Sequence, residues 1–362
     1  MLDSLFAGGA MKLSQSKEIA RDVVSTPLSA FSAETLKPLH PALEHWRIQF
    51  NQLLASLPPE QKTATPEAAR QALAGITSRF VCAGPELYRV EGAVLGGDDL
   101  TEALQCPLPL MLYQAVEKPD ALVLFVHGGG HVAGSIEVYD PICRRLAQES
   151  GQAVLAMDYP LAPANPWPAG IKSVAELMRL LPHVLDTFQL SPGIRVMMIG
   201  DSGGAAMAAT LCLQQPKTLP GYPEALVLLY PSLDYRMQAG SIQQFSEGYF
   251  LTEERMRWYF DQYLQGRVEP LSVSPSAMPV PSHFPRTLLM SAGYDPLRDE
   301  AGFFFGKLIN AGVDVDGVCY EQMLHAFLNL ESLVPEACQD AYNAISRFLA
   351  AGRTKGLGQV KD

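Results

Sequence analysis

The chain has 362 residues, of which 48% are hydrophobic and 18% charged. This composition supports a large buried core and excludes an intrinsically disordered protein. The net charge is −11 and lysine and arginine form no long runs, which excludes an electrostatic site for nucleic acid and disfavours docking on anionic membranes.

The beginning of the chain, Met1-Leu-Asp-Ser-Leu-Phe-Ala, is a poor secretory signal because an acidic residue stands beside a short apolar run. No apolar stretch approaches the roughly 20 residues that a membrane-spanning helix requires. The 6 cysteines are scattered without a C-x-x-C pair, and several of them are expected to be reduced core residues, with a disulfide left open as the alternative. These features predict a cytoplasmic protein with no stable membrane anchor.

The first 85 residues are expected to form an N-terminal helical cap segment. Apolar residues recur there at steps of three and four and give one apolar stripe. They are Leu43, Trp46, Phe50, Leu53 and Leu57. A second helix is predicted to start at Thr65-Pro66, a cap followed by a first-turn proline, and to run to about Phe80.

From about residue 105, short apolar runs alternate with helical patterns, which is typical of a parallel sheet covered on both faces. The expected strands are Leu108–Gln114, Leu122–Val126, Ala153–Met157, Arg195–Ile199, Ala225–Leu229, Thr287–Ser291 and Val315–Tyr320. One helix is expected to begin at Asp140-Pro141 and to end at Gly151. The fold class is therefore α/β, doubly wound, with a mostly parallel central sheet.

One long excursion, from Ser232 to Pro285, separates two of these strands and is far longer than an ordinary connection. It contains a helical run over Thr252–Gln265 and then a segment rich in proline and serine. We expect this excursion and the N-terminal helices to form a lid over the active site. The predicted organisation after the N-terminal segment is a first core part over residues 86–235, a cap insertion over 236–285 and a second core part over 286–362.

Two glycine-rich motifs directly follow expected strands. The first is His127-Gly128-Gly129-Gly130 and the second is Gly200-Asp201-Ser202-Gly203-Gly204. A G-x-S-x-G segment between a strand and a helix forms a nucleophile elbow, a tight turn that exposes the serine hydroxyl above the sheet. The HGGG segment supplies backbone N–H groups for an oxyanion hole. Together, in this order, they predict ester hydrolysis by Ser202.

A serine nucleophile needs a base, and the base needs an acid that holds it in the correct tautomer. His325 comes shortly after the strand expected at Val315–Tyr320, across a predicted loop over 321–324. Asp295 follows the strand expected at Thr287–Ser291. Both residues therefore fall at the edge of the sheet where open α/β folds bind ligands. Asp299, one helical turn further on, competes for the acid role, and we prefer Asp295 because it lies nearer the strand end.

These motifs resemble the hormone-sensitive-lipase family of serine esterases, which has the α/β-hydrolase fold with a helical cap. The resemblance covers roughly residues 120–350 and includes, beside the two motifs above, Asp158-Tyr159-Pro-Leu-Ala-Pro163, Asp295-Pro-Leu-Arg-Asp-Glu300 and His325-Ala-Phe327. It implies a triad of Ser202, Asp295 and His325. It also implies an oxyanion hole built from the amides of Gly129, Gly130 and Gly203.

The sequence departs from the family pattern at three places. Gly203 and Ala205 exchange the usual order of alanine and glycine after the serine, which leaves the Gly203 amide in place. Pro160 and Ala164 replace an arginine and a glutamate that the family usually has, which suggests a lost ion pair. The third departure is His131, which stands where the family usually has an aromatic residue.

Four further residues are assigned to the surroundings of the predicted site. His127 and Gly128 are expected to support this loop, His127 by hydrogen bonding. His131 and Tyr159 are candidates for the substrate pocket, although a plain packing role for His131 is equally compatible with the sequence.

The predicted activity is that of a serine carboxylesterase acting on short- to medium-chain esters through an acyl-enzyme, without a metal or cofactor. A deacetylase or amidase with the same triad remains open. A non-catalytic ligand-binding protein on a hydrolase scaffold, as in the gibberellin receptors that resemble this family, is the alternative of another class. The receptors lack the catalytic histidine, whereas this chain has His325. A homodimer through an edge strand over residues 315–320 is also expected from the family.

Overall fold

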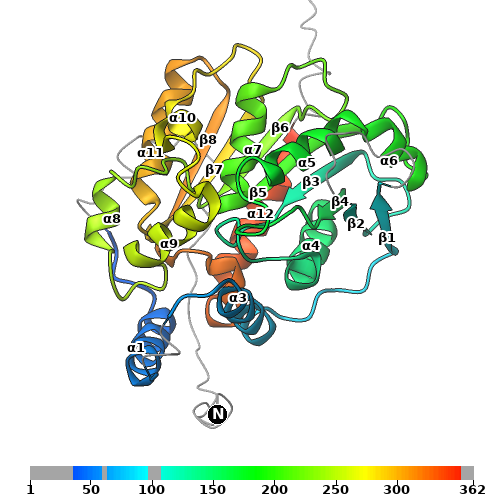
Figure 1. The fold of residues 1–362 in the computed structure, drawn as a ribbon. Coiled ribbons are helices and arrows are strands. Elements are labelled where there is room, and N and C mark those ends of the chain that lie inside the picture. Colours follow the sequence, from blue (N-terminus) through cyan, green and yellow to red (C-terminus); the bar gives the residue numbers. More distant parts are fainter. Residues whose placement is uncertain (1–35, 59–62, 97–106, 352–362) are drawn as a thin grey trace, which may run out of the picture.

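The computed structural model describes residues 36–58, 63–96 and 107–351, and these form one sheet with helices on both faces (Figure 1). The strand order is β1-β2-β4-β3-β5-β6-β7-β8. The strands are β1 (Arg89–Leu95), β2 (Leu108–Gln114), β3 (Ala121–Val126), β4 (Ala153–Met157), β5 (Arg195–Asp201), β6 (Ala225–Leu229), β7 (Arg286–Tyr294) and β8 (Val315–Leu324). Strand β2 runs antiparallel to both of its neighbours, and β3 to β8 are parallel to one another.

The helices cover the sheet in two layers. They are α1 (Pro41–Ser56), α3 (Pro66–Phe80), α4 (Ile136–Ser150), α5 (Ala169–Arg179), α6 (Leu181–Thr187), α7 (Gly203–Gln214), α8 (Gly240–Gln244), α9 (Glu253–Leu264), α10 (Pro270–Val273), α11 (Arg298–Asn310) and α12 (Pro335–Ala351), with short 3-10 helices η3 (Pro275–Ala277) and η4 (Phe327–Leu333). Helices α5, α6, α7 and α11 pack on one face, and α4 and α12 pack on the other.

The central strands are apolar at every position because both of their faces are covered. In β3, Leu122 and Leu124 belong to the cluster under α7, whereas Val123 and Phe125 belong to the cluster under α4. All six residues of this strand are buried. The alternation of side chains along a strand thus turns a continuous apolar run into contacts with two helical layers.

Seven of the eight strands are confirmed near their expected positions, and the differences have physical reasons. Strand β1 was not expected because most of its residues are exposed and its sequence is not continuously apolar. Strand β8 continues to Leu324, so the expected loop over 321–324 is wrong: these residues are strand, and His325 follows it directly.

The expected helix start at Asp140-Pro141 is also wrong. Helix α4 starts at Ile136, where the Ser135 side chain accepts a hydrogen bond from the N–H of Val138, and Pro141 lies inside the helix. The serine cap satisfies a free N–H group of the first turn and so places the helix start one turn earlier. The expected end is confirmed, because Gly151 closes the helix in the left-handed conformation with φ 65°.

The N-terminal helices pack on the α4 side of the sheet, where α3 contacts α4 and η4. Both are confirmed, and the expected stripe of α1 buries Leu43 and Trp46. In α3, the Arg70 guanidinium donates to the carbonyl oxygens of Val132 (3.0 Å) and Ala162 (3.3 Å). Residues 1–35 of the expected cap segment lie outside the described residues, and the assignment of cap and core parts stays a prediction.

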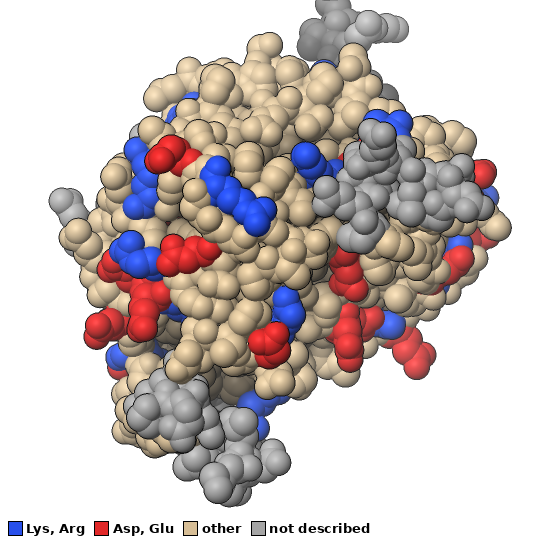
Figure 2. Space-filling view, in the orientation of Figure 1, with Lys and Arg blue, Asp and Glu red and all other residues tan. Residues whose placement is uncertain are grey.

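The excursion between β6 and β7 carries α8, α9, α10 and η3, and the helical run expected at 252–265 is confirmed as α9. The Thr252 side chain caps α9 by accepting from the N–H of Arg255. On the face shown in Figure 2, acidic and basic side chains lie intermixed. Among the helices of the described ranges, none is both long and apolar enough to cross a bilayer.

Candidate active site

Ser202 occupies the turn between β5 and α7 in a conformation that a non-glycine residue rarely adopts, with φ 52° and ψ −119°. Such a strained conformation is held only by close packing around it. A Cβ on Gly200 would lie 2.6 Å from the carbonyl oxygen of Gly204, and one on Gly204 would strike the carbonyl oxygen of Val126. The two glycines therefore let the turn pack directly against itself and against the end of β3.

The structure brings Ser202, His325 and Asp295 together in one hydrogen-bonded chain. The Ser202 hydroxyl lies 3.0 Å from Nε2 of His325, and Nδ1 of His325 lies 2.7 Å from Oδ2 of Asp295. Both His325 and Asp295 are buried. This arrangement can move the serine proton to the imidazole and stabilise the imidazolium that forms. The catalytic roles themselves stay a prediction.

The competing acid, Asp299, points elsewhere. Its Oδ2 accepts from the N–H of Ser241 at 2.8 Å, and its Oδ1 accepts from the Arg298 guanidinium at 2.9 Å. Asp295 has a second contact as well, because its Oδ1 accepts from the N–H of Leu297 at 2.8 Å. That bond fixes the carboxylate so that its other oxygen faces the histidine.

The HGGG loop passes directly beside the nucleophile. Gly129 and Gly130 have φ values of 109° and 61°, which favour glycine. The Gly129 carbonyl oxygen accepts from the N–H groups of Val132 and Ala133, which closes the turn. A Cβ on Gly203 would lie 3.4 Å from the nitrogen of Gly130, so these two backbones are neighbours. Their oxyanion-binding role stays a prediction.

His127 and Tyr159 lie behind this loop. The His127 ring stacks on Tyr159 with centroids 4.3 Å apart, and its Nδ1 lies 2.8 Å from the Gly128 carbonyl oxygen. The Tyr159 hydroxyl donates to the His127 carbonyl oxygen at 2.7 Å. Burial lowers the pKa of His127 to about 4, so the ring is neutral near pH 7. The expected support by His127 agrees with this geometry, and contact of Tyr159 with substrate stays a prediction.

Asp201 joins the nucleophile turn to the HGGG loop, a role that the sequence reasoning did not assign. Its Oδ1 accepts from the N–H of Gly128 at 2.6 Å, and its Oδ2 accepts from the Tyr139 hydroxyl at 3.0 Å. Burial raises the pKa of Asp201 to about 7. The feature of the sequence that could have indicated this role is an acidic residue at the end of an otherwise apolar strand, directly before Ser202.

Aromatic residues of the excursion cover the HGGG loop, and the sequence reasoning did not single them out. The Tyr259 ring lies over Gly130, where a Cβ would stand 2.5 Å from a ring atom. Tyr263 stacks on His131 with centroids 3.8 Å apart, and the Tyr235 hydroxyl lies 3.2 Å from Nε2 of His131. Burial lowers the pKa of His131 to about 3. His131 thus has the packing contacts that correspond to one of the two roles expected for it. The other role, contact with substrate, stays a prediction.

The chain is similar to known hydrolases. Residues 123–329 match the family model of the alpha/beta hydrolase fold. The chain is 36% identical over 220 residues to the carboxylic ester hydrolase LipN of Mycobacterium tuberculosis, covering 59% of this chain and 58% of that relative, which is less than two thirds of its length. It is 30% identical over 239 residues to an ethyl acetate hydrolase of Pseudomonas putida, covering 64% of this chain and 74% of the relative.

Solved esterases share the fold over most of the chain. An ester hydrolase from the metagenome of Lake Arreo, in complex with a derivative of bipyridine phosphonate, superposes with a TM-score of 0.78 at 27% identity, covering 87% of this chain and 99% of that one. A hyperthermophilic esterase from the archaeon Pyrobaculum calidifontis gives a TM-score of 0.73 at 27% identity, with the same coverage of 87% and 99%.

Proposed function

The chain belongs to the alpha/beta hydrolase fold family, among the hormone-sensitive-lipase-like serine esterases, and we propose that it is a serine carboxylesterase acting on small esters. One observation carries the proposal. The Ser202 hydroxyl lies in hydrogen-bonding distance of His325, which in turn contacts Asp295, and the HGGG backbone lies beside the same serine. A nucleophile, its base and its oxyanion donors are therefore adjacent in space.

The reaction proceeds in two acyl-transfer steps. Nε2 of His325 takes the Ser202 proton as the serine oxygen attacks the ester carbonyl carbon, and Asp295 stabilises the imidazolium. The tetrahedral intermediate collapses, the imidazolium gives its proton to the leaving alkoxide, and the C–O bond of the ester breaks. A water molecule then attacks the acyl-enzyme by the same route and releases the acid and free Ser202.

The oxyanion of each tetrahedral intermediate is held by the amides of Gly129, Gly130 and Gly203. Each such donor contributes about 3 kcal/mol to the transition state in hydrolases where one has been removed. Asp201 supports this loop through the N–H of Gly128.

We propose an acyl group of short to medium length, because the Tyr259 ring of α9 packs over Gly130 in the loop beside Ser202. The similarity to a relative named as an ethyl acetate hydrolase favours small esters. A series of p-nitrophenyl esters from acetate to palmitate tests this proposal. A maximum of kcat/KM at about four to eight acyl carbons supports it, and a preference for the longest chains contradicts it.

The first experiment is hydrolysis of p-nitrophenyl butyrate by the wild type, by Ser202→Ala and by the control Ser78→Ala on the exposed side of α3. Activity should fall about 10⁴-fold or more in Ser202→Ala and stay unchanged in the control. Activity that survives in Ser202→Ala rejects the nucleophile. A wild type that binds esters without hydrolysing them favours the ligand-binding alternative, and comparable turnover of the matching anilide favours the amidase.

A homodimer through β8 is a further part of the proposal. This strand is the last in the sheet order, and the residues Val315–Tyr320 are mostly half-buried. A strand at the edge of a sheet is a position where a second copy of a chain can pair. Light scattering over a range of concentrations tests it, and a mass that stays at 39.4 kDa contradicts it.

A cytoplasmic location completes the proposal. Cys143, Cys212 and Cys338 are buried free thiols, as is usual in a reducing compartment. Cell fractionation followed by detection of the protein tests the location, and recovery in a secreted fraction contradicts it.

A further inference from the structure

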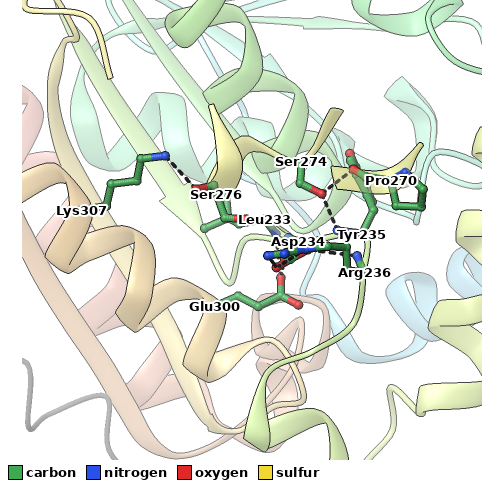
Figure 3. Close-up of polar contacts among 9 residues, drawn as sticks. All are labelled: Leu233, Asp234, Tyr235, Arg236, Pro270, Ser274, Ser276, Glu300 and Lys307. Atoms are coloured by element: carbon green, nitrogen blue, oxygen red, sulfur yellow. Dashed lines mark hydrogen bonds and ion pairs between the residues drawn. The ribbon is translucent and has the colours of Figure 1, made fainter. Parts of the chain in front are cut away.

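The excursion between β6 and β7 leaves and rejoins the core at one place, which we call the neck and define as residues 233–236 and 274–278. Its two segments bind each other. The N–H of Ser276 donates to the Leu233 carbonyl oxygen at 3.0 Å, and the N–H of Tyr235 donates to the Ser274 hydroxyl at 2.9 Å (Figure 3). These hydrogen bonds join the two ends of the excursion where it meets the core.

Helix α11 holds both segments of the neck with two side chains. Oε2 of Glu300 accepts from the N–H groups of Leu233 (2.8 Å) and Asp234 (3.0 Å). The Lys307 ammonium donates to the carbonyl oxygens of Ser276 (2.7 Å) and Met278. Figure 3 shows both side chains extending from one helix toward the neck. Since α11 follows directly on the loop of Asp295, the neck is tied to the acid side of the active site.

Tyr235 extends from the neck to the HGGG loop. Its ring packs edge-on against Phe260, with centroids 5.0 Å apart, and its hydroxyl lies 3.2 Å from Nε2 of His131. That same nitrogen lies 3.3 Å from the place that a Cβ would take on Gly203. The Tyr235 hydroxyl thus contacts the His131 ring. This ring lies beside Gly203, one proposed oxyanion donor, and His131 directly follows Gly130, another, in the sequence.

His131 needs external support to stay in this position. Its φ of 65° is in the left-handed region, which a histidine rarely adopts. The ring is buried and its Nδ1 has no hydrogen-bond partner among the described residues, so Tyr235 supplies the hydrogen bond of this side chain. Loss of that bond would leave both ring nitrogens buried and unpaired, which favours a shift of the ring and of the loop that carries it.

We propose that Tyr235 is a positioning residue for the oxyanion loop, on which it acts through His131. The Ser274 hydroxyl holds the N–H of Tyr235, and Glu300 holds those of the two residues before it. The inference rests on the proposed function, since it assigns a role within that reaction. A shift of the loop moves the Gly129 and Gly130 amides away from the place where negative charge develops, which lowers kcat and leaves the ground-state binding of the ester almost unchanged. The neck therefore affects the rate of the chemical step.

A double-mutant cycle tests the proposal on p-nitrophenyl butyrate. Tyr235→Phe and His131→Phe should each lower kcat about tenfold, with KM changed less than about twofold, because each leaves one buried polar group without its partner. The double variant Tyr235→Phe/His131→Phe replaces both partners by apolar rings and should recover to within about threefold of the wild type. Tyr222→Phe, which removes a hydroxyl bonded to the Cys212 carbonyl oxygen, is the matched control and should leave kcat unchanged.

A second pair of variants tests the tie to α11. Glu300→Gln keeps an acceptor for the two N–H groups of the neck and should retain kcat, whereas Glu300→Leu removes it and should lower kcat about tenfold at unchanged KM. Melting temperatures are measured for every variant, and rates are compared well below the lowest one, so that loss of fold does not enter the comparison.

The outcomes separate this inference from the proposed function. Single variants that leave kcat unchanged, effects that multiply in the double variant, or losses confined to KM overturn the role of Tyr235 even if the wild type is a good esterase. Equal rates for wild type and Ser202→Ala overturn the proposed function instead. Recovery in the double variant together with loss in each single variant supports the positioning role.

Discussion

Replacing Glu300 by glutamine should remove a source of instability at alkaline pH. Glu300 is 2% exposed, and its Oε1 has no hydrogen-bond partner among the described residues. The pKa of this carboxyl is raised from 4.5 to about 8. Burial is the main cause, the two neck N–H groups oppose it, and the neighbouring carboxylates of Asp234 and Asp295 add to it. A glutamine keeps an oxygen for these N–H groups and carries no charge at any pH.

The magnitude follows from the difference between the two pKa values. Between pH 4.5 and pH 8 the folded protein holds one proton here that the unfolded chain has released, so the free energy of unfolding falls as pH rises through this window. The stabilisation by the neutral Glu300 carboxyl is complete below pH 4.5 and is lost above about pH 8. A rise from 4.5 to about 8 corresponds to roughly 5 kcal/mol. The glutamine variant should gain about this much relative to the wild type between pH 4.5 and pH 9.

Urea denaturation at pH 5, 7 and 9 measures the effect. The free energy of unfolding of the two proteins should be close at pH 5 and should diverge progressively toward pH 9, with the variant the more stable. Glu117→Gln, at an exposed loop position, is the control and should show no divergence. A difference between Glu300→Gln and wild type that is the same at all three pH values would refute the reasoning, because it would mean that the carboxyl does not titrate differently in the folded state.

Three other predictions concern the site itself. Asp295→Asn should lower kcat about 10³- to 10⁴-fold in initial-rate assays, since His325 loses its carboxylate partner. Asp299→Asn should leave kcat within about threefold of the wild type. A larger loss in Asp299→Asn than in Asp295→Asn would assign the acid role to Asp299. Gly130→Ala should lower kcat about 100-fold, because its Cβ would stand 2.5 Å from a Tyr259 ring atom, and full activity in this variant would contradict the observed packing. Asp201→Ala removes the acceptor for the buried N–H of Gly128 and should lower kcat about tenfold. Asp201→Asn keeps an acceptor, so its kcat should stay close to that of the wild type. Equal rates for the two variants would argue against a hydrogen-bonding role.

Features that depend on local chemistry were accessible from the sequence. The central strands were found because burial on both faces makes them continuously apolar, and Gly151 marked a helix end because it adopts the left-handed conformation. The nucleophile turn was found because its close packing admits only glycine at Gly200 and Gly204. Where two local signals competed, the sequence misled: Pro141 suggested a helix start that Ser135 sets instead.

Contacts between distant segments were decided only by the tertiary structure. Asp295 and Asp299 are both acidic residues just after β7, and the packing of β8 beside that strand brings the first of them to His325. Tyr235 and His131 are 104 residues apart and meet because the neck of the excursion is fixed to α11. The sequence by itself determined the buried central strands and the glycine-rich turn of Ser202, since each is specified by neighbouring residues. Which side chains meet around Ser202 depends on the strand order and on how the excursion packs, and no local pattern encodes either.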